Sequence, residues 1–116
     1  MTVPAGARIH EEETFGPVLV AQPVETAEEA VAVANATRYG LSAGLITGDN
    51  QRGFNLARQI DSGVVHVNDQ TIADEPQLPL GGVKDSGWGR SGPGSMQDFT
   101  EVQWITTREG TGHYPI

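Results

Sequence analysis

The stretch that decides the fold runs from Thr26 to Val67 and reads TAEEAVAVANATRYGLSAGLITGDNQRGFNLARQIDSGVVHV. It opens with a capping-box pattern, in which the Thr26 hydroxyl caps a helix and the Glu29 carboxylate bonds back to its start. Small apolar residues at helical spacing follow, and they suit close packing on a sheet. Gly40 predicts the end of this helix, and Ala43–Thr47 has the composition of a buried strand.

The second half of the stretch repeats this order. Asp49 or Asn50 predicts the cap of a second helix that ends at Gly63, and residues 64–67 read as another buried strand. Upstream, the apolar run between Pro17 and Pro23 predicts a strand as well. Strand, helix, strand, helix, strand indicates a three-stranded parallel βαβαβ unit of the α/β class, with right-handed crossovers.

A long loop follows, from Asn68 to Gln97, and its most ordered part is PLGGVKDSGWGR, residues 79–90. Glycine at this density indicates a backbone that turns through positive φ or is approached closely by other atoms. Trp88 and the spacing of charged and polar residues differ from a flexible linker, whose composition is repetitive. We therefore predict a shaped loop with a functional role.

Two features that could suggest a functional site, a glycine pattern in the loop and a histidine just before it, are better explained by structural roles. The spacing Gly87, Gly89, Gly92 matches Gly-x-Gly-x-x-Gly, but it runs into Pro93 rather than opening a helix, so we predict no dinucleotide phosphate site. His66 is the only histidine within a predicted element, and no nucleophile or acid pair is arranged with it. We predict a hydrogen-bonded side chain at a strand edge rather than a catalytic group.

The last predicted element is a strand at residues 98–107, DFTEVQWITT, in which Val102 and Trp104 alternate with polar residues. A lone strand with a large apolar side chain needs a partner, and none is near in sequence. We accordingly predict a boundary between residues 1–97 and a final strand and tail, residues 98–116.

Composition excludes several classes of function. The 116 residues suit one domain, and the net charge of −8 leaves no basic surface for nucleic acid or an acidic membrane. The absence of cysteine removes disulfides, thiolate zinc sites and a cysteine nucleophile, and we predict no metal site. No apolar run approaches the roughly 20 residues of a membrane helix, and the first residues do not resemble a signal peptide. We predict a cytoplasmic protein.

Three segments resemble the aldehyde dehydrogenase superfamily. The loop motif of residues 79–90 is similar to a segment near the C-terminus of that family. Glu11–Val18, EEETFGPV, resembles the family's Glu-x-Phe-Gly-Pro segment, and Asn35–Gly44, NATRYGLSAG, resembles its Asn-x-Thr-x-Tyr-Gly-Leu-Ser-Ala-Gly segment. The matches come in family order and span residues 11 to about 106.

This resemblance implies a C-terminal piece of an NAD- or NADP-dependent aldehyde dehydrogenase, an oxidoreductase. In the family a cysteine thiolate attacks the aldehyde, hydride passes to nicotinamide, and a glutamate base assists hydrolysis of the thioester. The cysteine, the Rossmann domain and the base would lie upstream of Met1, so this chain supplies no catalytic residue. By resemblance, Glu13 accepts hydrogen bonds from the nicotinamide ribose, Phe15 packs beside the nicotinamide, and Ile72 and Leu80 form part of the substrate wall.

The resemblance also bears on substrate and assembly. Leu80 stands where the family usually has phenylalanine, which weakens any transfer of pocket shape. The run NDQTIADEPQLPLGG, together with the ending HYPI, resembles members that oxidise aromatic aldehydes such as benzaldehyde. By resemblance, residues 1–97 form the C-terminal part of the family's catalytic domain, and residues 98–116 form an oligomerisation arm strand and tail. Such an arm implies a homo-oligomer or a self-associating chain.

Two other hypotheses remain open. The chain could be a non-catalytic α/β interaction module that pairs with another chain through its exposed strand, which the absence of cysteine favours. It could also be an α/β domain with a glycine-rich surface loop and no ligand.

Overall fold

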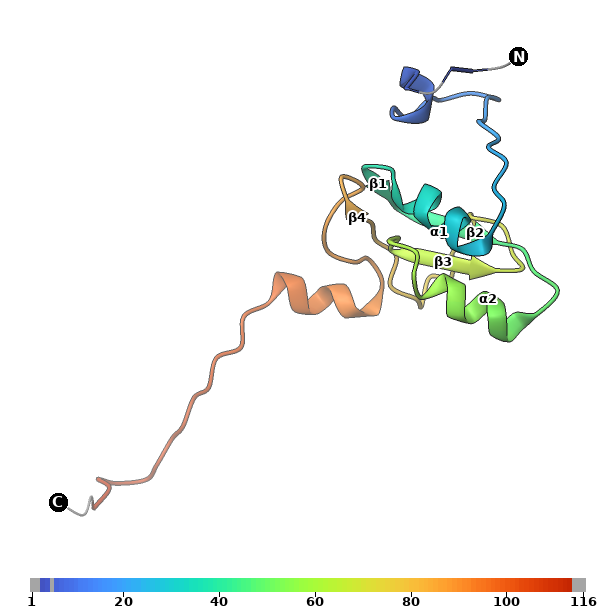
Figure 1. Ribbon diagram of the computed structural model, residues 1–116. Coiled ribbons are helices and arrows are strands. Elements are labelled where there is room, and N and C mark those ends of the chain that lie inside the picture. The colour runs from blue at the N-terminus through green and yellow to red at the C-terminus, as the bar shows by residue number, and fades with distance from the viewer. Residues whose placement is uncertain (1–2, 5, 114–116) are drawn as a thin grey trace.

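The computed structural model describes residues 3–4 and 6–113, and Figure 1 shows how its elements are arranged. Tyr114–Ile116 of the HYPI ending therefore lie outside the described residues. In chain order the elements are η1 (Arg8–His10), α1 (Ala27–Asn35), β1 (Tyr39–Gly40), β2 (Ser42–Leu45), α2 (Asn50–Ala57), β3 (Val64–Val67), β4 (Val83–Lys84) and η2 (Pro93–Phe99).

Both helices begin where the sequence predicts. The Thr26 hydroxyl accepts a hydrogen bond from the Glu29 main-chain N–H at 3.1 Å, and the Glu29 carboxylate accepts one from the N–H of Glu25 at 2.8 Å. The Glu29 carboxylate thus bonds to the N–H of Glu25, one residue before the predicted partner, Thr26. At α2, Asp49 Oδ1 accepts from the N–H groups of Gln51 and Arg52. These side chains satisfy N–H groups that have no partner within their own helix.

The centre of the fold is a parallel pair of strands joined by a helix. β2 and β3 pair in parallel with Ser42 opposite Val64 and Leu45 opposite Val67, and α2 connects them. Figure 1 shows α1 and α2 close to this pair. The βαβ part of the predicted unit is therefore present.

The predicted third parallel strand is not formed, so the expectation of a three-stranded sheet was wrong for the described residues. Residues 17–23 have extended backbone without strand pairing, and the side chain of Leu19 is largely exposed. The prolines at both ends lack N–H groups, and the N–H of Val18 bonds to the carbonyl of Gly16 at 2.8 Å instead of to a neighbouring strand. An apolar run becomes a strand only where a sheet edge is available to it.

The long loop contains structure that the sequence did not predict. β4 pairs antiparallel with β1, with Tyr39 opposite Lys84 and Gly40 opposite Val83. Near its end the chain turns into the 3-10 helix η2, which runs across the predicted boundary at residue 97. The loop is thus attached to the chain segment that follows α1.

The C-terminal segment differs from its predicted strand. Its first two residues belong to η2, and the rest runs as an extended chain without strand pairing. Figure 1 shows this segment leading away from the body of the molecule. Because its side chains are exposed, with Trp104 at 89%, no packing partner lies beside it among the described residues.

The surface of the chain is much larger than that of a compact protein of its size. The solvent-accessible area is 10058 Å², against roughly 6100 Å² for a compact 12.3 kDa monomer. The radius of gyration is 22.3 Å, where about 13 Å is typical of a compact domain of this length. No large apolar side chain among the described residues is fully buried. The chain therefore leaves open faces that a self-contained domain would cover.

Within residues 3–4 and 6–113, no helix has the length and apolar character needed to cross a bilayer.

Candidate functional site

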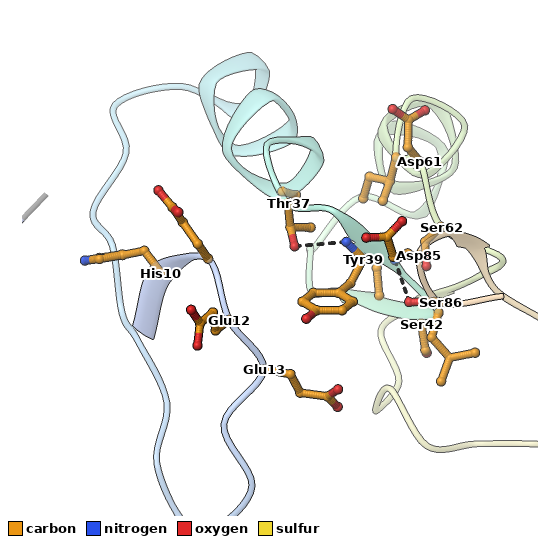
Figure 2. Close-up of a pocket in the computed structure, with 16 residues that line it drawn as sticks. His10, Glu12, Glu13, Thr37, Tyr39, Ser42, Asp61, Ser62, Asp85 and Ser86 are labelled. Atoms are coloured by element: carbon orange, nitrogen blue, oxygen red, sulfur yellow. Dashed lines mark hydrogen bonds between the residues drawn. The ribbon is translucent and has the colours of Figure 1, made fainter. Parts of the chain in front are cut away.

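A cavity of about 550 Å³ lies between the N-terminal segment and the β1–β4 pair. Figure 2 shows Glu12 and Glu13 on one side of it and Tyr39, Asp85 and Ser86 on the other. Four separate parts of the chain line it: His10–Glu13, the region from Ala34 to Ala43, Ile60–Ser62, and Asp85 with Ser86. Each of the three segments that resemble the aldehyde dehydrogenases contributes residues to this lining.

Main-chain hydrogen bonds fix the inner wall of this cavity. The N–H of Gly40 donates to the Ser86 hydroxyl at 2.9 Å, and the N–H of Asp85 donates to the carbonyl of Arg38 at 3.0 Å. The bond from Asp85 extends the short β1–β4 ladder by one residue, and the bond to the Ser86 hydroxyl ties Gly40 to the loop motif. Ser86 and Asp85 of the loop motif therefore hold the wall in place.

Acidic side chains dominate the cavity, and two of them are paired with arginine. Arg8 binds Glu12 with Nη2 to Oε2 at 2.6 Å, and Arg38 binds Asp85 with Nη2 to Oδ2 at 2.5 Å. The bond from Arg8 lowers the pKa of Glu12, and Asp85 raises the pKa of Arg38. Both pairs are exposed to solvent, so they contribute little to stability.

Glu13, like Glu11, lines this cavity with a carboxylate that can accept bonds from a hydroxyl-bearing ligand. Its carboxylate lines the cavity and makes no hydrogen bond or ion pair with the described residues. An ionised carboxylate with free acceptor sites can take two hydroxyl donors, as a ribose presents them. Phe15, the other residue predicted to contact a cofactor, is 89% exposed and does not line the cavity.

The residues predicted to form the substrate wall are separated. Leu80 lines a second cavity of about 690 Å³, built from the glycine-rich loop and the start and end of η2. Ile72 is 75% exposed and lines neither cavity. Trp88 and Phe99 line the second cavity together with Leu80, and the sequence did not single them out as site residues. The signal that could have found Trp88 is a large aromatic side chain within a run of glycines.

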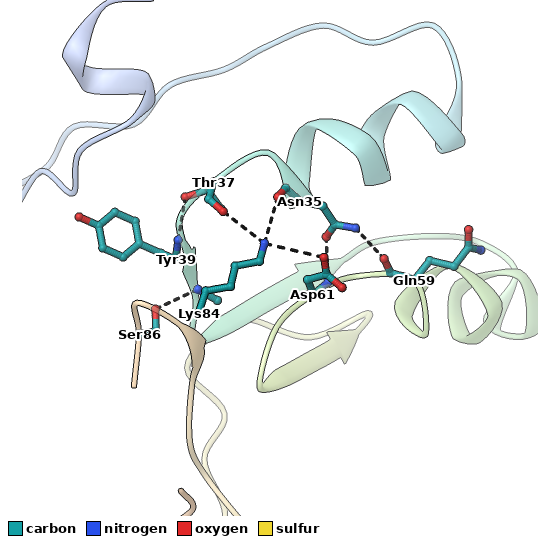
Figure 3. A network of polar contacts seen from close by, with 8 residues as sticks. Asn35, Thr37, Tyr39, Gln59, Asp61, Lys84 and Ser86 are labelled. Atoms are coloured by element: carbon teal, nitrogen blue, oxygen red, sulfur yellow. Dashed lines mark hydrogen bonds and ion pairs between the residues drawn. The ribbon is translucent and has the colours of Figure 1, made fainter. Parts of the chain in front are cut away.

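A lysine of the loop motif joins the ends of both helices, as Figure 3 shows. Lys84 Nζ donates to the carbonyls of Asn35 at 3.0 Å and Thr37 at 3.2 Å, and lies 3.9 Å from Asp61 Oδ2. A cation at these carbonyls satisfies acceptors at the C-terminal end of α1 and complements the helix dipole. Lys84 has φ of 53°, which a non-glycine residue rarely adopts.

The Asn35 side chain completes this network. Its Nδ2 donates to the carbonyl of Gln59 at 2.7 Å, and its Oδ1 accepts from the N–H of Asp61 at 2.8 Å. Asn35 therefore ties the end of α1 to the turn after α2. The motif residues Asn35 and Lys84 have structural roles in positioning the cavity wall.

The predicted histidine contact is not found. His66 lies in β3, and its Nε2 atom is buried without a hydrogen-bond partner among the described residues. His66 lines neither of the two cavities described above.

Comparison with known proteins establishes the class. Residues 1–105 match the aldehyde dehydrogenase family, and this chain belongs to that family. It is 43% identical over 115 residues to a vanillin dehydrogenase of Pseudomonas fluorescens, covering 98% of this chain and 24% of that protein. It is 38% identical over 118 residues to a benzaldehyde dehydrogenase [NAD(+)] of Pseudomonas putida, covering 100% of this chain and 24% of that protein.

A solved structure agrees with these sequence relatives. The salicylaldehyde dehydrogenase of Pseudomonas putida G7, in complex with salicylaldehyde, superposes with a TM-score of 0.86 and 38% identity, covering 98% of this chain and 24% of that chain. The chain thus spans about a quarter of the length of the curated relatives it matches.

Proposed function

We propose that this chain forms part of an NAD- or NADP-dependent aldehyde dehydrogenase that oxidises aromatic aldehydes to carboxylic acids. The observation that carries this proposal is the similarity, along nearly the whole chain, to proteins named for vanillin, benzaldehyde and salicylaldehyde. The cavity with the free Glu13 carboxylate supports a site for the cofactor ribose.

The chemistry divides between this chain and the rest of such an enzyme. A nicotinamide cofactor, when bound, accepts the hydride. The chain has no cysteine, so the thiolate that attacks the aldehyde carbonyl and carries the thioester comes from outside these 116 residues. Its own side chains bind and orient: Glu13 holds the ribose hydroxyls, Phe15 packs beside the nicotinamide, and Leu80 and Ile72 contribute to the substrate wall.

A chimera tests this function. In it, the present chain replaces the matching quarter of the Pseudomonas fluorescens vanillin dehydrogenase. We expect the chimera to form NADH from NAD⁺ and benzaldehyde, because the chain restores one side of the cofactor site and of the substrate wall. The matched control is the same vanillin dehydrogenase with that quarter deleted. A folded chimera that binds no cofactor and is as inactive as the deletion variant would refute the proposal.

A second function, pairing with another chain, is favoured by the extended C-terminal segment. Trp104 and Val102 are almost wholly exposed there, and the backbone has no strand pairing. Exposed backbone groups beside apolar side chains form a template for strand pairing between chains. We propose that this segment mediates self-association, despite a net charge of −8, because charge repulsion is screened beyond about 8 to 10 Å at ordinary salt.

Light scattering of the isolated chain over a concentration series tests this second function. The expected result is a mass that rises with concentration and falls towards the monomer mass in the Trp104→Lys variant. A monomer mass at every concentration, unchanged by that substitution, would show that the segment does not pair with a second copy.

A further inference from the structure

The second cavity contains two aromatic side chains with no assigned role. Trp88 projects from the glycine-rich loop and is 96% exposed, and Phe99 is the last residue of η2. Both line the same cavity of about 690 Å³ as Leu80. Covering a large exposed indole removes apolar surface from water, which is favourable, so a ligand that packs on Trp88 gains affinity.

The loop that carries Trp88 is braced by its own hydrogen bonds. Ser91 closes its neck, because its N–H and hydroxyl both donate to the carbonyl of Leu80, at 2.7 and 3.1 Å. Arg90 Nη1 donates to the carbonyls of Gly82 and Gly89 at 3.0 and 2.8 Å. A braced loop holds its side chains in place before a ligand arrives, which lowers the entropy cost of binding.

The direction of Trp88 follows from its neighbours. Gly87 and Gly89 have φ of 123° and 76°, and the chain bends at Trp88 and Gly89. The turn places Trp88 at the rim of the cavity rather than against the loop backbone, consistent with its exposure. Leu80, at the neck of the same loop, is half-buried.

The lining of the cavity suits a planar aromatic ring. Its apolar side chains are those of Leu41, Leu80, Trp88 and Phe99, and its polar groups come mainly from residues 86–98. Its volume falls in the range of about 300 to 1,000 Å³ that small-molecule sites occupy. Aromatic rings prefer offset or edge-to-face contacts with one another, and these contacts add affinity beyond simple area burial.

We propose that Trp88 and Phe99 are specificity-determining residues that receive the ring of an aromatic aldehyde beside Leu80. This inference rests on the proposed function, because it takes Leu80 as part of the substrate wall. The two side chains contact the ring and not the aldehyde carbon, so they select the substrate without taking part in bond making.

The test compares substrates in the chimera defined above. Steady-state kcat and KM are measured for benzaldehyde and hexanal in the parent chimera and in its Trp88→Ala, Trp88→Phe and Phe99→Leu variants. We expect Trp88→Ala to lower kcat/KM for benzaldehyde by about three- to tenfold relative to hexanal, mainly through KM. Trp88→Phe keeps a ring and retains most of the preference. Phe99→Leu keeps apolar volume but has no ring, so we expect it to lose part of the preference for benzaldehyde.

Phe54→Ala is the matched control, since Phe54 is an exposed aromatic residue that does not line this cavity. An unchanged ratio of benzaldehyde to hexanal in Trp88→Ala, in an active chimera, would overturn the inference and leave the proposed function intact. An equal loss of preference in Phe54→Ala would also overturn it, as would a change only in oligomeric mass on size-exclusion chromatography. A parent chimera inactive with both aldehydes would refute the proposed function itself.

Discussion

Gly63 and Gly81 approach each other so closely that a Cβ atom on Gly63 would lie 1.6 Å from the carbonyl oxygen of Gly81. Gly63 precedes β3, and Gly81 belongs to the glycine-rich loop. The contact is between two backbones, so no side chain can rotate away to relieve it. The loop can therefore lie against the parallel strand pair only if residue 63 has no side chain.

The first prediction concerns this contact. Gly63→Ala in the chimera should lower the free energy of unfolding by at least about 1 to 3 kcal/mol, the cost of overpacking, because one backbone must move. Thermal unfolding measures the change. The control is Gly48→Ala, where a Cβ atom would meet nothing within 4 Å. Equal melting temperatures for the two variants would show that the loop does not pack on Gly63.

The second prediction concerns Lys84. Lys84→Met removes the ammonium from the carbonyls of Asn35 and Thr37 while keeping most of the apolar stem. We expect a loss of about 1 to 3 kcal/mol in unfolding free energy, because a charged donor is lost from two acceptors. Arg58→Met provides the comparison, since Arg58 is exposed and its side chain makes no hydrogen bond among the described residues. If both variants unfold at the parent denaturant concentration, the network of Figure 3 does not hold the helix ends together.

The third prediction concerns the cofactor. Glu13→Gln in the chimera should weaken NAD⁺ binding by about 1.5 to 3 kcal/mol, because hydrogen bonds from hydroxyls to a charged acceptor are replaced by bonds to a neutral amide. Isothermal titration calorimetry measures the affinity. Glu11→Gln is the matched control, as it removes a charge from the same cavity two residues away. Equal affinity in both variants and the parent would show that the role proposed for Glu13 is wrong.

The elements that the sequence predicted correctly depend on local signals. Thr26 and Asp49 cap their helices through bonds to N–H groups two or three residues away, which a reader of the sequence can see. The valines of β3 predict a strand, and the strand forms because β2, with which it pairs, lies close to it in sequence. The family resemblance of the three motifs is likewise confirmed by the match over residues 1–105.

The elements that the sequence did not predict depend on distant partners. Residues 17–23 and the segment after η2 have strand-like composition, but neither has a paired edge among the described residues. The β1–β4 pair was missed because it joins residues more than 40 positions apart and includes Lys84 in a left-handed conformation. Only the folded chain brings Glu13 opposite Tyr39 and Ser86, so spacing alone could not define the cavity.

The central claim is that this chain positions cofactor and substrate but lacks the nucleophile. It is tested most directly by the rate of NADH formation from NAD⁺ and benzaldehyde, followed at 340 nm, for the isolated 116-residue chain. We predict a rate equal to the buffer control, because covalent oxidation of an aldehyde needs a thiolate and the chain has no cysteine. Sustained NADH formation by a preparation shown to contain no other enzyme would contradict the account.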